Sequence, residues 1–210
     1  MTTTATRTGP SRVLLAGVGI IVGSLVLGGL TSVAQGLLPD SLSSFANSPS
    51  GWTVLTVLLI ATARPRLLPA ALLGAVSFVC LVLGYTIVSE LRGLSYSPLF
   101  WGVIGLVAGP VIGWSTAAAS TRKPLLSAVG SSLIAGVLIT DAVYGLTVVA
   151  DTTSPVYWWI VGVAGVLFLA IVAVRQQLSG RYVAMLLGLT LIWIALGTAG
   201  YSVLNGVQGG

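Results

Sequence analysis

The four acidic residues of this chain are its best candidates for chemistry, and one of them lies inside an apolar stretch. Asp141 directly follows Thr140 and precedes Tyr144 by three residues. An ionisable side chain in apolar surroundings costs several kcal/mol unless it is paired or hydrated, so it is a functional candidate. Residues three apart on a helix share a face, which places Tyr144 beside Asp141. Two interpretations are open: Asp141 lines a binding pocket, or it holds two helices together through Tyr144 or a neighbouring hydroxyl.

A second carboxylate, Glu90, stands near the end of another apolar stretch. Thr86 lies four residues earlier and is predicted to share its helix face. Arg92 is only two residues away, a spacing that does not align side chains on a helix. Glu90 is therefore either part of a polar pocket or a solvated acid at a helix end.

Aromatic residues gather near the same ends of the apolar stretches as the acids. Tyr and Trp favour membrane interfaces for physical reasons alone, which is one interpretation of this pattern. The other is a pocket whose carboxylates and aromatic walls would suit a small organic cation, through ion pairing and cation–π attraction. On that hypothesis the predicted substrate-binding residues are Asp141, Glu90, Tyr144, Tyr85, Trp101, Trp158 and Asn47.

Other chemistries lack the residues that they need. The chain has no histidine, and its single cysteine, Cys80, lies in an apolar run. No phosphate-binding loop and no Gly-x-Ser-x-Gly elbow occurs in the sequence. The only lysine, Lys123, lies between apolar stretches. We therefore expect no catalytic residues, no metal, no cofactor and no enzymatic activity. Because the basic residues occur singly or in pairs, we also expect no nucleic-acid partner.

The composition indicates a membrane protein. Of 210 residues, 56% are hydrophobic and only 6% are charged, whereas soluble domains have roughly 25% charged residues. At about 20 residues per transmembrane helix, the chain can form about seven spans and no separate soluble domain. The predicted fold class is an all-α, polytopic transmembrane helical bundle that lies in a lipid bilayer.

Apolar runs define the predicted spans. The second is short, because a helix begun at Pro49 would reach only about 22 Å at 1.5 Å per residue. The alternative is that this span is partly re-entrant, with part of the preceding loop dipping back into the protein. The first run is longer than the apolar core of a signal peptide and is interpreted as an uncleaved helix. We expect a tail over 1–11, a single transmembrane domain over 12–204 and a tail over 205–210, with spans near 12–37, 52–63, 67–91, 98–119, 125–150, 156–174 and 182–204.

Charge placement predicts the orientation of the bundle. With seven spans, eight of the nine basic residues lie on one side and only Arg92 lies on the other. Basic residues accumulate in cytoplasmic loops, so the N-terminus is predicted to be cytoplasmic and the C-terminus outside. Asp40, Glu90 and Asp151 then lie at the outer face. The expected location is the bacterial cytoplasmic membrane.

Small residues recur at spacings that favour helix contacts in lipid. Gly105, Gly109 and Gly113 are each four apart, as are Gly19 and Gly23. Such faces allow close approach between helices. The partner helix is predicted to belong to the same chain, to a second copy or to another membrane protein.

Several short motifs carry a family resemblance over about residues 45–145. They are Ala46-Asn47-Ser48, Trp52, Arg64-Pro-Arg66, Ala70-Ala-Leu-Leu-Gly74, Gly84-Tyr85, Trp101 and Gly109-Pro110-Val-Ile-Gly113. This stretch resembles a family of small actinobacterial membrane proteins of unknown function, whose members tend to carry an acid where Asp141 stands. The resemblance implies no established activity. The chain is also similar in type to substrate-capture subunits of energy-coupling-factor transporters, although those have six helices.

These features favour transport or binding of a small, cationic solute from the outer side. The alternative is a non-transporting scaffold or regulatory partner of another membrane complex. The two hypotheses differ in their expectation for Asp141: a solute site needs it in a water-accessible cavity with Glu90, and a scaffold needs it sealed among helices.

Overall fold

The computed structural model describes residues 10–208, and the side chains of residues 14–203 within that range. The described residues form eight helices and no strands, which confirms the predicted all-α helical bundle. Arg7 and Arg12, two of the eight basic residues on which the predicted orientation rests, lie outside the residues whose side chains are described. The helices are α1 (Pro10–Leu37), α2 (Asp40–Asn47), α3 (Pro49–Ala63), α4 (Leu67–Leu91), α5 (Leu99–Ala119), α6 (Pro124–Thr147), α7 (Pro155–Arg175) and α8 (Gly180–Gln208).

Six of the described helices, all except α2 and α3, are long and apolar enough to cross a bilayer. The protein is therefore an integral, multi-pass membrane protein. Helix α3 has 15 residues, so it reaches about 22 Å and is shorter than a hydrocarbon core of roughly 30 Å. Helix α2 occupies the loop expected between the first two spans, and α8 continues past the expected end of the transmembrane domain.

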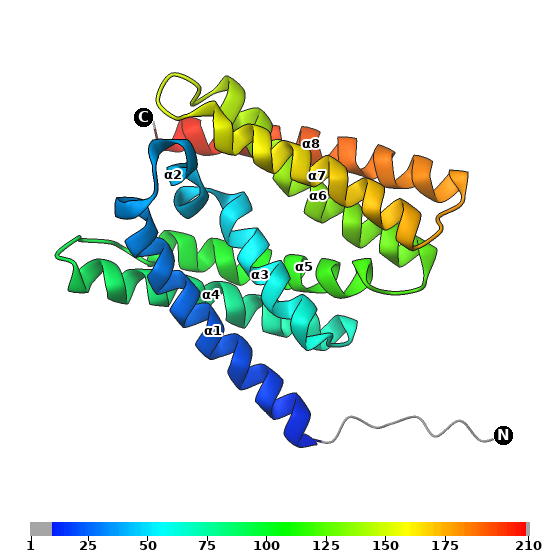
Figure 1. Cartoon of the computed structure of the whole chain (residues 1–210), viewed down its shortest axis with the longest axis horizontal. Coiled ribbons are helices and arrows are strands. Elements are labelled where there is room, and N and C mark those ends of the chain that lie inside the picture. Colours follow the sequence, from blue (N-terminus) through cyan, green and yellow to red (C-terminus); the bar gives the residue numbers. More distant parts are fainter. Residues whose placement is uncertain (1–9, 209–210) are drawn as a thin grey trace.

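The helices form two groups (Figure 1). In the first group α4 packs along both α1 and α5, and α3 contacts α1, α4 and α5. In the second group α6 packs against both α7 and α8. The groups meet where α5 and α3 contact α6, and where α2 contacts α7. Helix α6 is consequently the most enclosed of the six long helices.

Close backbone approach explains the small residues of the first group. A Cβ added to Gly113 of α5 would lie 2.0 Å from the carbonyl oxygen of Ala70 on α4, and one added to Gly109 would lie 2.6 Å from the carbonyl oxygen of Gly74. Small residues at such crossings bring helices together in lipid, where packing replaces the hydrophobic effect. Gly19 of α1, by contrast, has no neighbour within 4 Å of an added Cβ.

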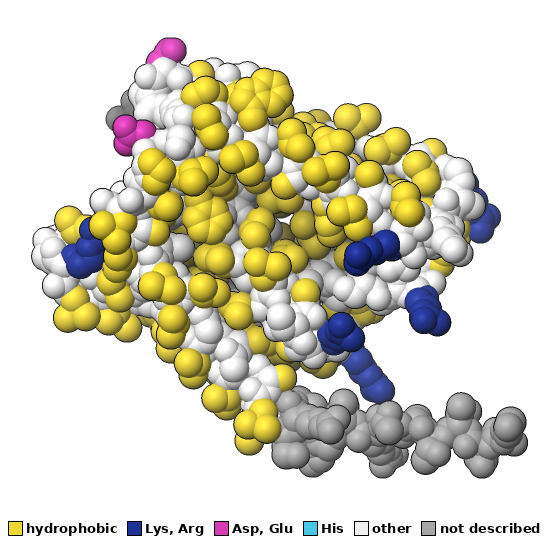
Figure 2. Space-filling model, viewed as in Figure 1, with side chains coloured by type: hydrophobic (Ala, Val, Ile, Leu, Met, Phe, Trp, Pro, Cys, Tyr) yellow, Lys and Arg dark blue, Asp and Glu magenta, His cyan; other side chains and the backbone are white. Residues whose placement is uncertain are grey.

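Charged groups are separated between the two ends of the molecule (Figure 2). Lys and Arg atoms gather at one end, and acidic atoms lie at the other, where a single basic group is also seen. In the described chain the loops 64–66, 120–123 and 176–179 join helices at the basic end, and α2 and the loops 92–98 and 148–154 lie at the acidic end. This is the separation that the predicted loops imply.

Gly113→Ala should destabilise the protein, because its methyl group would collide with the backbone of α4. Overpacking of this kind typically costs about 1–3 kcal/mol. Gly19→Ala is the matched control, since its methyl group meets nothing and alanine favours a helix by up to about 1 kcal/mol. Thermal unfolding in detergent should show a lower Tm for Gly113→Ala only; equal Tm values for the two variants would contradict the close crossing of α4 and α5.

Candidate functional site

The carboxylate of Asp141 lies at the centre of a buried cluster of polar groups. Its Oδ2 accepts a hydrogen bond of 2.9 Å from the backbone N–H of Ser50. Its Oδ1 accepts a hydrogen bond of 2.5 Å from the hydroxyl of Tyr201. The side chain is 1% exposed. Asp141 of α6 therefore joins the beginning of α3 to α8.

The position of Ser50 explains why a carboxylate is suited to this place. Ser50 is the second residue of α3, so its N–H has no acceptor within the helix. The N-terminus of a helix also carries a partial positive charge, which favours an anionic group. The hydroxyl of Tyr157 on α7 shares hydrogen bonds of 2.8 Å with Ser48 Oγ and 2.7 Å with Ser50 Oγ. We refer to Asp141, Ser48, Ser50, Tyr157 and Tyr201 as the Asp141 cluster.

Three other predicted site residues take different positions. Tyr144 lies beside the cluster, as its spacing predicts, with its ring stacked on that of Tyr201 at a centroid distance of 4.1 Å. Trp158 is buried and donates a hydrogen bond of 2.9 Å to Thr153 Oγ1. Glu90 is exposed, and no ion pair or hydrogen bond of its side chain occurs among the described residues. The structure does not bring Glu90 and Asp141 together.

The other predicted residues, Asn47, Tyr85 and Trp101, line a cavity of about 560 Å³ between the two groups of helices. The wall from the second group is formed by α6 and α8. Most of the cavity surface is apolar or aromatic, as in sites that bind small organic molecules. Further aromatic side chains on its walls are Trp52, Phe78, Tyr96, Trp193 and Tyr201.

A chain of polar side chains lies at the acidic end of this cavity. The hydroxyl of Tyr85 donates a hydrogen bond of 2.7 Å to Gln35 Oε1, and Gln35 Nε2 donates to Asn47 Oδ1. The ring of Tyr96 contacts that of Tyr85 edge-on, with centroids 4.7 Å apart. Burial, and secondly the nearby Tyr85, raise the pKa of Tyr96 to about 12. Its hydroxyl therefore stays protonated at neutral pH and can donate a hydrogen bond.

No acidic side chain among the described residues lines this cavity. Asp141 lies behind its wall, because Ser48 and Tyr201 of the Asp141 cluster line the cavity and the carboxylate itself does not. A cation within the cavity would face aromatic rings and amides without a counter-charge. The geometry therefore suits an uncharged molecule better than the cation expected from the sequence.

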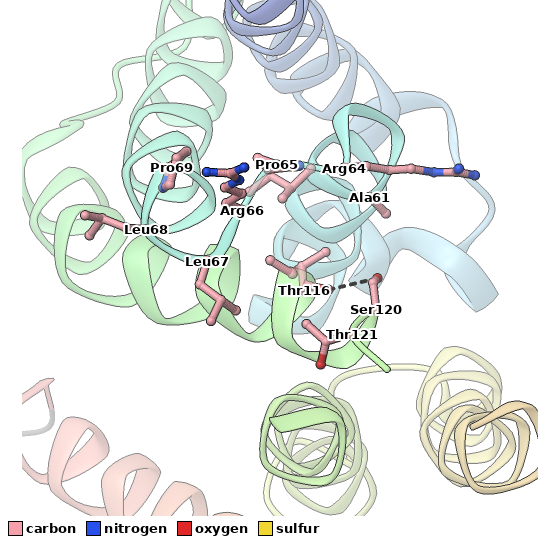
Figure 3. A pocket seen from close by; sticks show the side chains of 12 residues that line it. Ala61, Arg64, Pro65, Arg66, Leu67, Leu68, Pro69, Thr116, Ser120 and Thr121 are labelled. Carbon is pink, nitrogen blue, oxygen red and sulfur yellow. Dashed lines mark hydrogen bonds between the residues drawn. The ribbon is translucent and has the colours of Figure 1, made fainter. Parts of the chain in front are cut away.

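A second hollow, of about 920 Å³, lies at the basic end, where α3 ends, α4 begins and α5 ends. Arg64 and Arg66 belong to its rim, and neither guanidinium forms a hydrogen bond or an ion pair among the described residues. Figure 3 shows that Arg64 extends away from the remaining side chains, while Arg66 lies beside Pro69. The two basic groups therefore do not converge on one point.

The described residues contain no group of three or more His, Cys, Asp or Glu side chains that could hold a metal ion.

The model of a protein family matches residues 7–207, nearly the whole chain. The chain belongs to this family, the family of unknown function DUF6518. Comparison with curated proteins and comparison with solved structures each found no match. Membership confirms the expected uncharacterised family and assigns no activity, so function has to be argued from the cavity.

Sequence reasoning missed several residues that the structure brings together. Gln35 stands in the last turn of α1, and its amide in a mostly apolar helix was a detectable signal. Ser48, Pro49 and Ser50 form a typical helix start, with Ser48 Oγ accepting the Gly51 N–H at 3.1 Å. From the sequence, Tyr157 belongs only to the aromatic residues near the ends of the apolar stretches, because nothing relates it to a serine more than a hundred residues away.

Asp141→Ala should destabilise the protein, because it leaves the Ser50 N–H and the Tyr201 hydroxyl buried without an acceptor. Each unsatisfied group costs about 1–3 kcal/mol. Asp141→Asn, which keeps one acceptor oxygen, should lose less. Glu90→Gln is the control, since substitutions at exposed sites usually change stability by less than about 0.5 kcal/mol. Thermal unfolding in detergent measures all three, and a Tm for Asp141→Ala equal to that of Glu90→Gln would contradict the role of Asp141 in packing.

Proposed function

We propose that this membrane protein binds a small, uncharged and mainly apolar organic solute in the cavity between its two groups of helices. The observation that carries the proposal is the aromatic-walled cavity of about 560 Å³, which has a row of hydrogen-bonded polar side chains at one end. Cavities of roughly 300–1,000 Å³ with apolar walls and a few polar groups are typical of small-molecule sites. Asn47, Tyr85 and Trp101 are the binding residues retained from the sequence analysis.

The side from which the solute enters follows from charge. The loops at one end of the bundle carry Arg64, Arg66, Arg122 and Lys123, which favours a cytoplasmic position for that end. Asn47 and Tyr96 lie at the opposite end, so the polar end of the cavity is extracytoplasmic in this proposal. The corresponding location is the bacterial cytoplasmic membrane. Binding from the outer side is the arrangement expected of a transport protein or of a substrate-capture subunit.

A second candidate function is a scaffold or regulatory partner within a membrane complex. The buried carboxylate of Asp141 favours it, because this group of α6 bonds to α3 and α8 and does not line the cavity. Most of the surface of α8 is also uncovered by the rest of the described chain. A scaffold needs no solute in the cavity. A substitution that fills the cavity should therefore abolish solute binding without impairing a scaffold, which distinguishes the two candidate functions.

A screen of purified protein against uncharged aromatic compounds and organic cations, read by thermal shift, tests solute binding. A ligand at one hundred times its Kd stabilises the folded state by about 2.7 kcal/mol. Gly200→Trp should abolish such shifts, because Gly200 lines the cavity and has no neighbour within 4 Å of an added Cβ. Gly188→Trp, on the same helix and equally free of neighbours, does not line the cavity and should respond as the wild type.

Two results would count against the proposal. One is the absence of any stabilising compound, which favours the scaffold. The other is an unchanged shift in Gly200→Trp, which places binding elsewhere. Stabilisation by cations alone would replace the uncharged solute by the cation expected from the sequence.

A further inference from the structure

The cavity between the two groups of helices is enclosed on most of its sides by helices that pack on one another. Around it α8 packs on α6, α6 contacts α3, α3 contacts α4, and α4 packs on α5. The hydrogen bond between Ser50 and Asp141 joins α3 to α6 in this wall. The ring of Trp52 on α3 contacts those of Phe78 and Tyr85 on α4, at centroid distances of 6.2 and 5.6 Å. These contacts close the wall from α8 round to α5.

Other contacts cover the two ends of the cavity. At the basic end α5 crosses α6 closely, because a Cβ added to Gly130 of α6 would lie 2.5 Å from the carbonyl oxygen of Ser115 on α5. At the acidic end the hydrogen bond between Gln35 and Asn47 joins the end of α1 to α2. Tyr96 adds the loop that follows α4 to the same end of the cavity.

The remaining side of the cavity lies between α5 and α8. Both helices line the cavity, yet α8 packs extensively only on α6, whereas α5 packs on α3, α4 and α6. Leu196 of α8 lines the cavity and is also 57% exposed, so it stands at the edge of this opening. Neither α5 nor the segment 182–208 of α8 contains a charged residue. The opening therefore faces the hydrocarbon of the bilayer.

The depth of the cavity is close to that of one leaflet. Its lining residues on α5 run from Trp101, near the acidic end, to Ile112, which lies eleven residues farther along the helix. At 1.5 Å per residue this is about 16 Å, or half of a hydrocarbon core of roughly 30 Å. On α8 the lining residues run from Tyr201 to Trp193. A hydrocarbon chain of one leaflet can therefore lie in the cavity beside the chains of the surrounding lipid.

The acidic end of the cavity offers hydrogen bonds without a charge. Asn47 Oδ1 accepts a hydrogen bond from Gln35, and no hydrogen bond of the Asn47 amide nitrogen or of the Tyr96 hydroxyl occurs among the described residues. Asn47 is exposed and Tyr96 is half-buried, so neither side chain is sealed from a ligand. A hydroxyl group can donate to and accept from such groups. A charged group would find no counter-charge among the described lining residues.

We propose that the cavity binds an uncharged lipid of the outer leaflet, which enters sideways from the bilayer between α5 and α8. This inference rests on the proposed function and names the class of solute. The hydrocarbon chain lies between the aromatic and aliphatic walls, and a head group with hydroxyls bonds with Asn47 and Tyr96. Monoacylglycerols have this chemistry. Because bulk lipid is as apolar as the walls, the head-group bonds and the fit of the chain supply the selectivity.

The test is photolabelling of the full-length protein in phosphatidylcholine nanodiscs. The probe is a monoacylglycerol with a diazirine at the end of its chain, and labelled peptides are mapped by mass spectrometry. Lipid at the outer surface labels without saturation, whereas a binding site labels saturably. Three competitors carry one C18 chain: monoolein is uncharged, oleoyl lysophosphatidylglycerol is an anion and oleyltrimethylammonium is a cation. A fourth competitor, monobutyrin, has the head group of monoolein without the long chain.

In the wild type, saturable labelling is expected on peptides that contain Ile112 or Trp193, at the inner end of the cavity. Monoolein should compete roughly tenfold better than either charged lipid, because a charged head group would lose water without gaining a counter-charge. Monobutyrin at the same concentration should not compete, since it lacks the chain. Gly200→Trp, which fills the cavity, should abolish the saturable labelling, and Gly188→Trp should retain it.

A time course of the same labelling tests the entry from the side. Leu196→Trp places a larger side chain at the opening, so saturable labelling should become slower or disappear. Leu191→Trp is the matched control: Leu191 is 68% exposed on the same helix but does not line the cavity, so the wild-type rate should persist. A wild-type rate in Leu196→Trp, or an equal loss in both variants, would overturn entry between α5 and α8.

The outcomes separate this inference from the proposed function. If monobutyrin or a charged lipid competes as well as monoolein, the uncharged lipid is overturned and binding in the cavity stands. The same conclusion follows if an aromatic compound stabilises the protein, Gly200→Trp abolishes this effect, and no saturable lipid labelling occurs. The absence both of saturable labelling and of any stabilising compound overturns the inference and the proposed function together.

Discussion

The hydrogen bond between the Asp141 carboxylate and the first turn of α3 is the interaction on which the arrangement of this protein depends. Helix α3 has 15 residues and is too short to cross the hydrocarbon core, and its N-terminal end is buried within the protein. Backbone N–H groups there need an acceptor within the protein. Asp141 supplies one from α6, while Tyr201 binds the same carboxylate from α8. One acidic residue thus unites three helices.

The cavity follows from this arrangement. Within each group the helices pack closely, as the glycines of α4 and α5 show. Between the groups the Asp141 cluster fixes one end, and α5 contacts α6 along part of its length. Aromatic side chains from both groups line the space that is left. Because Asp141, the carboxylate behind its wall, is already engaged with α3 and α8, the described part of the cavity offers hydrogen bonds and aromatic surface without a negative charge.

The comparison between sequence and structure shows where local information was sufficient. The bounds predicted for the span 67–91 match α4, and a helix begun at Pro49 matches α3, because proline and flanking arginines mark these ends clearly. Helix α2 was missed, since eight mostly polar residues are too few to be recognised as a span, although Leu42, Phe45 and Ala46 recur at a helical spacing. Asp141 was correctly singled out as unusual. Its partners could not be named, because the Ser50 N–H and the Tyr201 hydroxyl come from distant segments.

The sequence by itself determined that this is a membrane protein of apolar helices with its charges divided between two ends. These properties depend on composition and on the order of residues along the chain, and both act locally. The tertiary structure alone decided which way Asp141 faces, that Glu90 lies apart from it, and that Asn47, Tyr85 and Trp101 share a cavity. Nearly every face of these helices is apolar, so hydrophobicity does not specify which face meets which neighbour. That choice rests on glycine contacts and a few buried hydrogen bonds between residues far apart in the chain.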